Sequence, residues 1–506
     1  MNTLSRTGQL IIRDQSATHL PEPTLAVLPQ VDKTPVTTSP TAGVALRSAG
    51  AAAAVTGAAS KNPAEGLTAL RVWQARLRST EPAELQRSLY DLAQEMPYLT
   101  PATQQGRWQE VCAAPGRQDK DAASVWVEGV FRIGGERAEQ ALADHLSGGE
   151  GTTESRTLAQ GLLAEMRAER SSREQLCGLA ESGNADRLAP VILPLPADFG
   201  NGVKDVQKIT LNAKDVGPEI DQMTSQVTRE QLLTAGVAPV LTTDCDGTTW
   251  KHDIGDALFG WAVQNRVFKR EAQNRLVALL RAYDIEPGAD VNDNARRLLT
   301  AQESGELISN GAKHGKDAAT VLAEYYAASV WCFAGHSVAQ VKTWGRKLFE
   351  QDGGFRGKLF DGVRRVLDEA RSRGFPAYAV SASNQWIVEV GAEYLGIPPW
   401  RVVGIKTRVD NGVITTDIEP PVTFGPGKVE AILAATGGRP AVAMGDSVNQ
   451  TDREMLESAV LPIAVEPNQA RVPYVLARAG KNWRFLDYPK TTDGESADTF
   501  EPNKQP

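Results

Sequence analysis

The sequence predicts an α/β fold with a parallel, doubly wound sheet, because short apolar runs alternate with helical patterns over its second half. We expect strands at 238–243, 377–380, 441–444, 461–465 and 483–486. The long segment between the first two strands, 250–375, has helical periodicity and few strand signals, so it should form an inserted helical lobe. The runs 401–409 and 412–418, joined by Asp-Asn-Gly, predict a β-hairpin.

Length and composition exclude several classes of protein. At 506 residues the chain is too long for one compact core, so two or three folded units are expected. A net charge of -8 argues against a nucleic-acid-binding protein that works through phosphate contacts. The four cysteines include no C-x-x-C pair, which argues against a disulfide framework or a structural zinc site. No run of about 18 apolar residues is present, so we expect no membrane span.

The chain divides into five predicted segments: a disordered leader (1–60), a helical module (61–187), a linker (188–205), a catalytic α/β domain (206–488) and a disordered tail (489–506). The leader is rich in Ser, Thr, Pro and Ala and has no aromatic residue, so it cannot bury enough apolar surface to offset its chain entropy. In the helical module, apolar residues such as Leu85, Leu89 and Leu92 recur at helical spacing. We favour a scaffold role for this module over targeting or binding of a host protein partner.

The segment 244–248, Asp-Cys-Asp-Gly-Thr, directly follows the first predicted strand. A strand that ends in this pattern presents one carboxylate, Asp244, for nucleophilic attack. The second carboxylate, Asp246, is free to move protons, and both are close enough to share a divalent cation. Cys245, between them, should point into the sheet because strand side chains alternate.

Three further elements follow in order: Ser381 in Val-Ser-Ala-Ser-Asn, Lys428 after a Gly-Pro-Gly turn, and Asp446 in Met-Gly-Asp-Ser. Each is weak alone. A serine is a common helix cap, and a lone lysine is usually a solvated surface charge. Four elements in this order, three of them closing predicted strands, form a strong combined signal for a site at one sheet edge.

This order resembles the haloacid dehalogenase (HAD) superfamily over roughly residues 240–486. The helical insertion after the first element is similar to a C1 cap of the phosphoserine-phosphatase-like branch, and 250–259 looks like the start of that cap. The resemblance implies a HAD-like Rossmannoid sheet with a helical C1 cap. Within that cap, Trp250 and His252 are candidates for contacts with the leaving group, although Trp250 could equally pack the cap stem.

The resemblance also implies roles for the site residues. Asp244 would be the nucleophile, and Asp246 would serve as general acid and then general base. A Mg²⁺ ion would be held by Asp244, by the backbone carbonyl of Asp246 and by Asp446. Lys428 would balance the aspartates and pair with the phosphoryl group.

Thr248 and Ser381 would hold the remaining phosphate oxygens or the loop. One departure from the family pattern concerns its second acid in the last element. Gln450 and Thr451 stand at the usual places, and Asp452 follows one residue later. We expect Asp452 to reach Lys428 or a metal-bound water through a slightly longer loop.

The sequence thus predicts a Mg²⁺-dependent phosphatase that hydrolyses a phosphate monoester through an aspartyl-phosphate. Its substrate would be a phosphorylated small molecule or a phosphoprotein. Two alternatives remain open: a phosphotransferase or atypical kinase that uses the same aspartates, and a non-catalytic binding protein on a HAD scaffold. The leader resembles the export signal of bacterial type III effectors, which implies secretion into a host cell. An ordinary disordered leader on a protein of the bacterial cytoplasm is the alternative.

Overall fold

The computed structural model describes residues 72–181, 209–351, 353–465, 472–478, 482–488 and 490–494. The leader, 1–60, and the linker, 188–205, lie outside these residues, and so do the predictions made for them. The predicted tail, 489–506, lies outside them too, except for residues 490–494, which do not fit a disordered segment. They run beside 357–361, where Phe360 and Thr491 form a β-bridge and Thr491 is fully buried.

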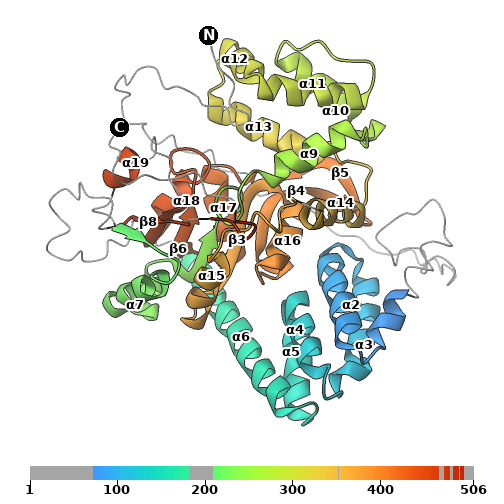
Figure 1. Ribbon diagram of the computed structural model, residues 1–506, viewed down its shortest axis with the longest axis vertical. Helices are drawn as coiled ribbons and strands as arrows, with labels where there is room; N and C mark the ends of the chain where they lie inside the picture. Colours follow the sequence, from blue (N-terminus) through green and yellow to red (C-terminus); the bar gives the residue numbers. More distant parts are fainter. Residues whose placement is uncertain are drawn as a thin grey trace, which may run out of the picture.

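Among the described residues, eight strands form one sheet at the centre of the catalytic half (Figure 1). Their order is β1-β8-β7-β6-β2-β3-β4-β5, and every neighbouring pair is parallel except β4 and β5. The strands are β1 (Thr210–Leu211), β2 (Val237–Thr243), β3 (Ala377–Asn384), β4 (Val402–Asp410), β5 (Val413–Glu419), β6 (Arg439–Gly445), β7 (Leu461–Val465) and β8 (Arg484–Leu486). Every residue of β2 is buried, because a central parallel strand is covered on both faces.

The predicted α/β class, the five strands and the hairpin are confirmed, with small shifts in their ends. The helix that precedes β3 does not include the apolar residues Leu359 and Phe360. That helix, α15, spans Val363–Ser372. It begins after Gly362, whose φ of 98° is a left-handed conformation that favours glycine and interrupts the helical pattern.

Helices cover both faces of the sheet, as a doubly wound fold requires. Alternate residues of β2 enter two different cores: Val237 and Leu241 enter one, and Ala238 and Val240 the other. The helices beside the sheet are α7 (Val216–Gln226), α8 (Arg229–Thr234), α15, α16 (Gln385–Tyr394), α17 (Pro426–Thr436), α18 (Arg453–Ser458) and α19 (Val472–Leu476).

The predicted helical insertion is present between β2 and β3. Its helices are α9 (Ile254–Gln264), α10 (Gln273–Ala282), α11 (Val291–Glu303), α12 (Glu306–Lys313), α13 (Ala318–Trp331) and α14 (Val338–Glu350). Helices α9 to α13 form a lobe at one side of the sheet, here called the cap (Figure 1). Asp253, Asp290 and Asp317 cap the starts of α9, α11 and α13 by accepting backbone N–H groups, which explains where these helices begin.

The N-terminal helices, here called the helical module, lie at the opposite end of the molecule from the cap (Figure 1). They are α2 (Pro82–Glu95), α3 (Pro101–Cys112), α4 (Ala123–Ile133), α5 (Gly135–Ser147) and α6 (Thr153–Glu181), and they enclose a hydrophobic core of their own. Trp400 of the catalytic domain packs against that core, and its indole N–H donates to the Phe131 carbonyl at 3.1 Å. The module and the catalytic domain therefore share a packed interface.

A buried ion pair between Lys342 on α14 and Glu389 on α16 lies at this interface, and both side chains are only 2% exposed. The module completes the hydrogen bonds of the pair. Lys342 Nζ donates to the Gln94 carbonyl at 2.6 Å, and the Tyr98 hydroxyl donates to Glu389 Oε1 at 2.8 Å. A buried pair needs such additional partners, because its two charges have been removed from water.

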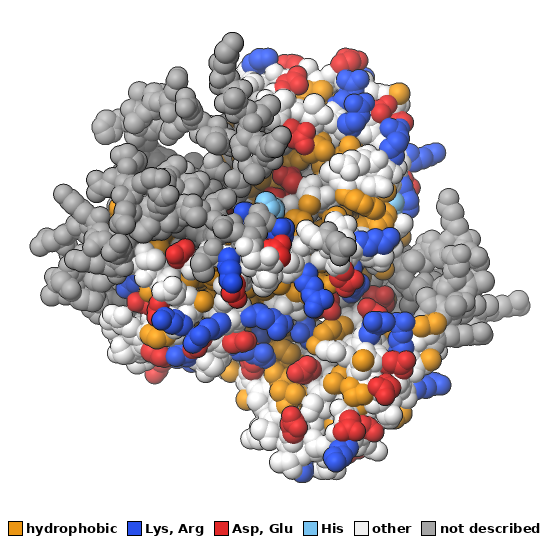
Figure 2. Space-filling model, viewed as in Figure 1, with side chains coloured by type: hydrophobic (Ala, Val, Ile, Leu, Met, Phe, Trp, Pro, Cys, Tyr) orange, Lys and Arg blue, Asp and Glu red, His pale blue; other side chains and the backbone are white. Residues whose placement is uncertain are grey.

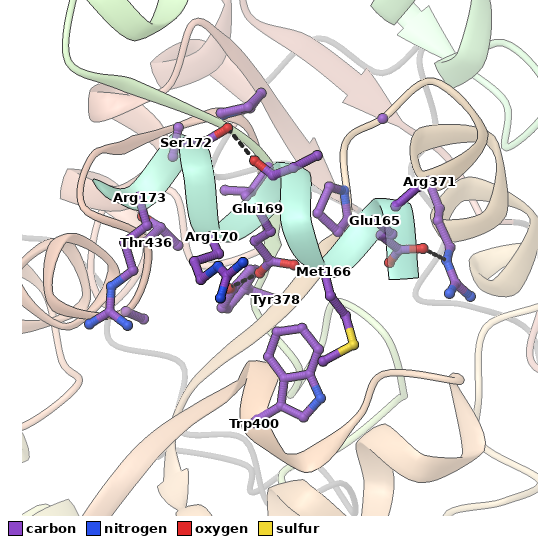
Figure 3. Close-up of a pocket in the computed structure, with 18 of the residues that line it drawn as sticks. Glu165, Met166, Glu169, Arg170, Ser172, Arg173, Arg371, Tyr378, Trp400 and Thr436 are labelled. Atoms are coloured by element: carbon purple, nitrogen blue, oxygen red, sulfur yellow. Dashed lines mark hydrogen bonds and ion pairs between the residues drawn. The ribbon is translucent and has the colours of Figure 1, made fainter. Parts of the chain in front are cut away.

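A cavity of about 710 Å³ lies between α6 and the first residues of β2 and β3 (Figure 3). It is at the end of the sheet opposite the carboxyl ends of the strands. Charged groups around it pair with one another: Arg371 Nε lies 2.9 Å from Glu165, and Arg170 Nη2 lies 3.1 Å from Glu139. Two other arginines on its wall have uncharged partners: Arg173 donates to the Ala434 carbonyl at 3.0 Å, and Arg229 donates to the Gly374 carbonyl at 3.2 Å.

Lys and Arg side chains alternate with Asp and Glu on the face shown in Figure 2, without a broad region of one sign. No helix in the part of the chain that the structure describes has the length and apolar character needed to cross a membrane.

Replacing Lys342 with Met should destabilise the protein by about 3–5 kcal/mol, because Glu389 would keep a buried charge without its partner. Urea unfolding followed by tryptophan fluorescence measures this change. The matched control is Lys406→Met, which breaks a solvent-exposed pair with Glu419 and should cost less than about 1 kcal/mol. Equal small effects for the two variants would show that the buried pair does not hold the interface.

Candidate active site

Asp244 is the first residue after β2, and the parallel pairing of β2 with β6 brings it beside Asp446. The Asp244 N–H donates to the Met444 carbonyl at 2.8 Å, which continues the strand pairing to the sheet edge. Gly247 turns the chain behind Asp244 with a φ of 79°. A Cβ atom at this position would lie 2.7 Å from Asp446 Oδ2, so only glycine permits this close approach.

Lys428 lies in the first turn of α17 and is fully buried between two carboxylates. Its Nζ is 2.6 Å from Asp244 Oδ1 and 2.6 Å from Asp452 Oδ1. Burial alone would lower the pKa of Lys428, but the two carboxylates outweigh it and hold the pKa above its ordinary value. Lys428 is therefore a permanent positive charge in the site, and not the solvated lysine that its composition alone would suggest.

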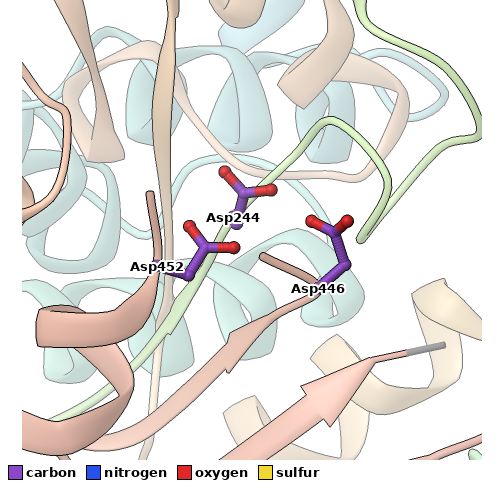
Figure 4. A group of neighbouring side chains, drawn as sticks. All are labelled: Asp244, Asp446 and Asp452. Atoms are coloured by element: carbon purple, nitrogen blue, oxygen red, sulfur yellow. The ribbon is translucent and has the colours of Figure 1, made fainter. Parts of the chain in front are cut away.

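Three carboxylates, those of Asp244, Asp446 and Asp452, converge beside this lysine (Figure 4). Each offers an oxygen, and these oxygens all lie within 4.8 Å of one another. Burial first, and then the charge of Asp452, raise the pKa of Asp244 well above its usual value, although Lys428 opposes the rise. One ammonium does not balance three carboxylates. The excess charge and the oxygen donors fit a hard divalent cation such as Mg²⁺.

The Asp246 carboxylate does not join this cluster; four donors hold it elsewhere. Trp250 Nε1 and the Ile254 N–H each donate to Oδ1 at 2.8 Å. Ser383 Oγ donates to Oδ2 at 2.7 Å, and Ser381 Oγ at 3.2 Å. Burial raises the pKa of Asp246, and these four hydrogen bonds oppose the rise. A metal bond from its backbone carbonyl stays a prediction.

The two hydroxyls predicted to bind phosphate contact the aspartates. Thr248 Oγ1 donates to Asp244 Oδ2 at 3.1 Å and accepts the Asp446 N–H at 3.0 Å. Ser381 Oγ accepts the N–H of Ser383 at 3.1 Å in addition to its bond with Asp246. Both side chains are fully buried, so they fix the orientation of the aspartates. Their contact with a phosphate stays a prediction.

Asp452 comes one residue later than the family pattern places its second acid, but its carboxylate is still part of the site. Besides its contact with Lys428, Asp452 Oδ2 accepts the Ser447 N–H at 2.9 Å. A Cβ atom at Gly445 would lie 2.7 Å from Asp452 Oδ2, so the loop after β6 depends on a glycine there. Asp452 therefore belongs to both the lysine pair and the carboxylate cluster. Cys245 is fully buried in the core, where strand alternation predicted it.

Two acids of the cap, Asp253 and Asp256, approach the aspartates, and the sequence analysis gave neither of them a role. Burial, Asp256 and Asp246 all raise the pKa of Asp253 well above its usual value. Burial also raises the pKa of Asp256 to about 6; Asp246 adds to the rise, and a hydrogen bond from the Tyr325 hydroxyl opposes it. Acids at the start of a helix are common as capping residues, so the sequence pattern did not indicate a role for these two in the site.

Aromatic rings lie beside these acids. The ring centroids of Tyr325 and Tyr326 on α13 are 5.6 Å apart, and those of Tyr326 and Phe424 are 5.9 Å apart. Burial first, and then Asp253 and Asp256, raise the pKa of Tyr326 well above its usual value, which places the ring in the field of the acids. Acidic and aromatic side chains of the cap thus lie within electrostatic range of the site.

Trp250 and His252 have different surroundings, and a contact of His252 with a leaving group stays a prediction. The Trp250 side chain is fully buried and its N–H is bonded to Asp246, so that donor does not face a leaving group. His252 has an exposed side chain and a left-handed φ of 74°. Ser383 also binds Asp246, although no role was predicted for it. It lies two residues after Ser381 on the same strand, and residues with this spacing share a face, so the sequence could have indicated it.

The fold and the site together define an α/β enzyme domain with a cluster of carboxylates and a buried lysine at the carboxyl end of a parallel strand. Residues 241–457 match the family model described as haloacid dehalogenase-like hydrolase. The chain therefore contains a HAD-like hydrolase domain, and the family resemblance noted in its sequence is confirmed. A search of curated proteins finds no match.

Solved structures similar to this chain include a protein with unknown function from Bordetella pertussis Tohama I, at 21% identity and a TM-score of 0.34. The match covers 49% of this chain and 98% of that one. A phosphoserine phosphohydrolase-like protein from Francisella tularensis subsp. tularensis SCHU S4 matches at 16% identity and a TM-score of 0.30. That match covers 49% of this chain and 94% of the other.

Adding Mg²⁺ to the metal-free protein should raise its melting temperature, because the cation binds carboxylates that repel one another. A saturating concentration, about 100 times Kd, stabilises by about 2.7 kcal/mol, or about 5–10 °C for a domain of this size. Asp446→Asn should remove most of this increase, and NaCl of equal ionic strength should produce little of it. An unchanged increase in Asp446→Asn would place the cation elsewhere.

Proposed function

We propose that the protein is a Mg²⁺-dependent phosphatase that cleaves a phosphate monoester through an aspartyl-phosphate. The observation that carries this proposal is Lys428, buried between Asp244 and Asp452 beside Asp446 at the carboxyl edge of the sheet. A dianionic phosphate would be repelled by carboxylates alone. The lysine supplies one compensating charge, and Mg²⁺ held by Asp244, Asp446 and Asp452 would supply the rest.

The residues suit two consecutive displacements at phosphorus. Asp244 Oδ attacks the phosphorus atom as the ester P–O bond breaks, and Asp246 gives a proton to the leaving alkoxide. A water molecule then attacks the phosphorus of the aspartyl-phosphate. Asp246 takes a proton from that water, and inorganic phosphate leaves with Asp244 restored. Asp246 lies two residues from Asp244 and four donors hold its carboxylate in one orientation, which supports a role for it in both proton transfers.

Asp244→Asn should lower hydrolysis of 4-nitrophenyl phosphate at least about 10³-fold, because the amide is not a nucleophile at phosphorus. The control makes the same change at Asp361, an exposed acid outside the site, and should leave turnover unchanged. Inorganic phosphate should appear at the same rate as nitrophenol. If phosphate lagged behind when another alcohol was present, the enzyme would be a phosphotransferase. Equal turnover by Asp244→Asn and wild type would contradict both assignments.

We also propose that the leaving group carries a positive charge. Asp253 and Asp256 lie within electrostatic range of Asp246, the Tyr325 hydroxyl donates to Asp256 at 3.1 Å, and the Tyr326 ring lies in the field of the two cap acids. Carboxylates and aromatic faces together stabilise an alkylammonium group, whereas they disfavour an additional anion. Phosphate esters of amino alcohols fit these acids and rings better than sugar phosphates or polyanionic nucleotides.

3,3-Dimethylbutyl phosphate has the shape of phosphocholine, with an uncharged carbon in place of the positively charged nitrogen. The ratio of their kcat/KM values should exceed about 10 at pH 8, since one desolvated ion pair accounts for about 1.4 kcal/mol. The ratio should fall as the pH drops through about 6, where Asp256 takes up a proton. The positive nitrogen lowers the second phosphate pKa of phosphocholine relative to that of the carbon analogue, so each kcat/KM is corrected for the titration of its own ester before the ratio is taken. Asp256→Asn should give a small ratio that does not vary with pH; a wild-type ratio near one would contradict a cationic leaving group.

Export as a type III effector rests on the composition of the leader, which lies outside the described residues. Deleting residues 1–60 tests it separately from catalysis. Delivery into host cells should be lost while turnover stays intact.

A further inference from the structure

Trp250 lies at the root of the cap, four residues after Asp246, in a loop closed by its own hydrogen bonds. The Gly247 N–H donates to the Trp250 carbonyl at 2.9 Å, and Trp250 bridges to both Asp246 and Leu359. Its side chain is fully buried. The backbone therefore fixes where the indole begins.

Two neighbouring helices fix the direction of the ring. Phe349 of α14 meets it edge to face, with ring centroids 5.6 Å apart and an interplanar angle of 89°. On the side of α16, a Cβ atom at Gly391 would lie 2.7 Å from Trp250 Cη2, so only glycine leaves room for the ring. The indole cannot rotate without displacing one of these helices.

The indole N–H meets a carboxylate oxygen that also receives a donor from the cap. Trp250 Nε1 and the N–H of Ile254, the first residue of α9, both donate to Asp246 Oδ1 at 2.8 Å. The other oxygen of Asp246 is held by Ser383 and Ser381 of β3. The Asp246 carboxylate thus connects the cap root to the sheet. Among the described residues, Trp250 is the one residue of the cap root that donates to it from a side chain.

We propose that Trp250 is a positioning residue that sets the orientation of the Asp246 carboxyl for proton transfer to the leaving group. This proposal rests on the proposed phosphatase function. An indole held by two helices presents its N–H in one direction, so it selects one rotamer of Asp246 and one position of α9 relative to the sheet. Loss of this donor should impair the two steps in which Asp246 moves a proton, and of these only protonation of the leaving oxygen enters kcat/KM. Asp244 and Lys428 should be unaffected, because neither contacts Trp250 by a hydrogen bond in the described structure.

Trp250→Phe tests the proposal, because it keeps an aromatic ring and removes the donor. The value of kcat/KM for an alkyl phosphate, whose alkoxide must be protonated, should fall about 10- to 100-fold. The value for 4-nitrophenyl phosphate, whose phenolate leaves unprotonated, should change less than about 3-fold. We expect the alkyl phosphate loss in kcat with KM nearly unchanged.

The matched control is Phe349→Leu, which loosens the packing of the ring and keeps its N–H. It should lower the melting temperature and change both substrates by the same factor. Equal losses for both substrates in Trp250→Phe, or the same selective loss in Phe349→Leu, would overturn the positioning role. In either case, loss of activity in Asp244→Asn would still support the proposed phosphatase function. If the wild type cleaved neither ester, both the phosphatase function and the positioning role of Trp250 would be wrong.

Discussion

The ammonium of Lys428 lies between Asp244 and Asp452 with no access to solvent, and the arrangement of the site follows from this contact. A buried lysine is stable only where carboxylates surround it, and it in turn lets those carboxylates remain close together. Because Lys428 comes from α17 and the two acids follow β2 and β6, the contact fixes three elements at the same sheet edge. Gly247 and Gly445 are required for the same reason: a side chain at either would collide with one of the acids.

Charge is distributed unequally around this contact. On the sheet side one lysine faces three carboxylates, an imbalance that suits a divalent cation and a phosphate together. On the cap side Asp253 and Asp256 have no comparable basic partner in the described structure, and their raised pKa values reflect this. The two sides therefore differ in the ligand charge that they favour. A molecule with a phosphate at one end and a cation at the other satisfies both.

The central strands could be predicted because buried parallel strands appear as short apolar runs bounded by Gly and Asp. Strand β1, with two residues, has no such signal. The site elements could be placed at one sheet edge because three of them close strands. The contact of Lys428 with Asp452, by contrast, depends on a loop geometry that spacing does not determine. The cap acids and the bond from Trp250 to Asp246 depend on how the cap rests on the sheet, which no local pattern encodes.

The helical module contacts the two helices that support Trp250. Helices α14 and α16 hold Trp250 between Phe349 and Gly391, and a few residues away they hold the buried pair of Lys342 and Glu389. If the two helices separated, the ring would lose its support and the ion pair would open. The module opposes that separation, since its Gln94 and Tyr98 bond to the two members of the pair. The contacts of the module therefore extend, through one helix pair, to the residue that we propose orients Asp246.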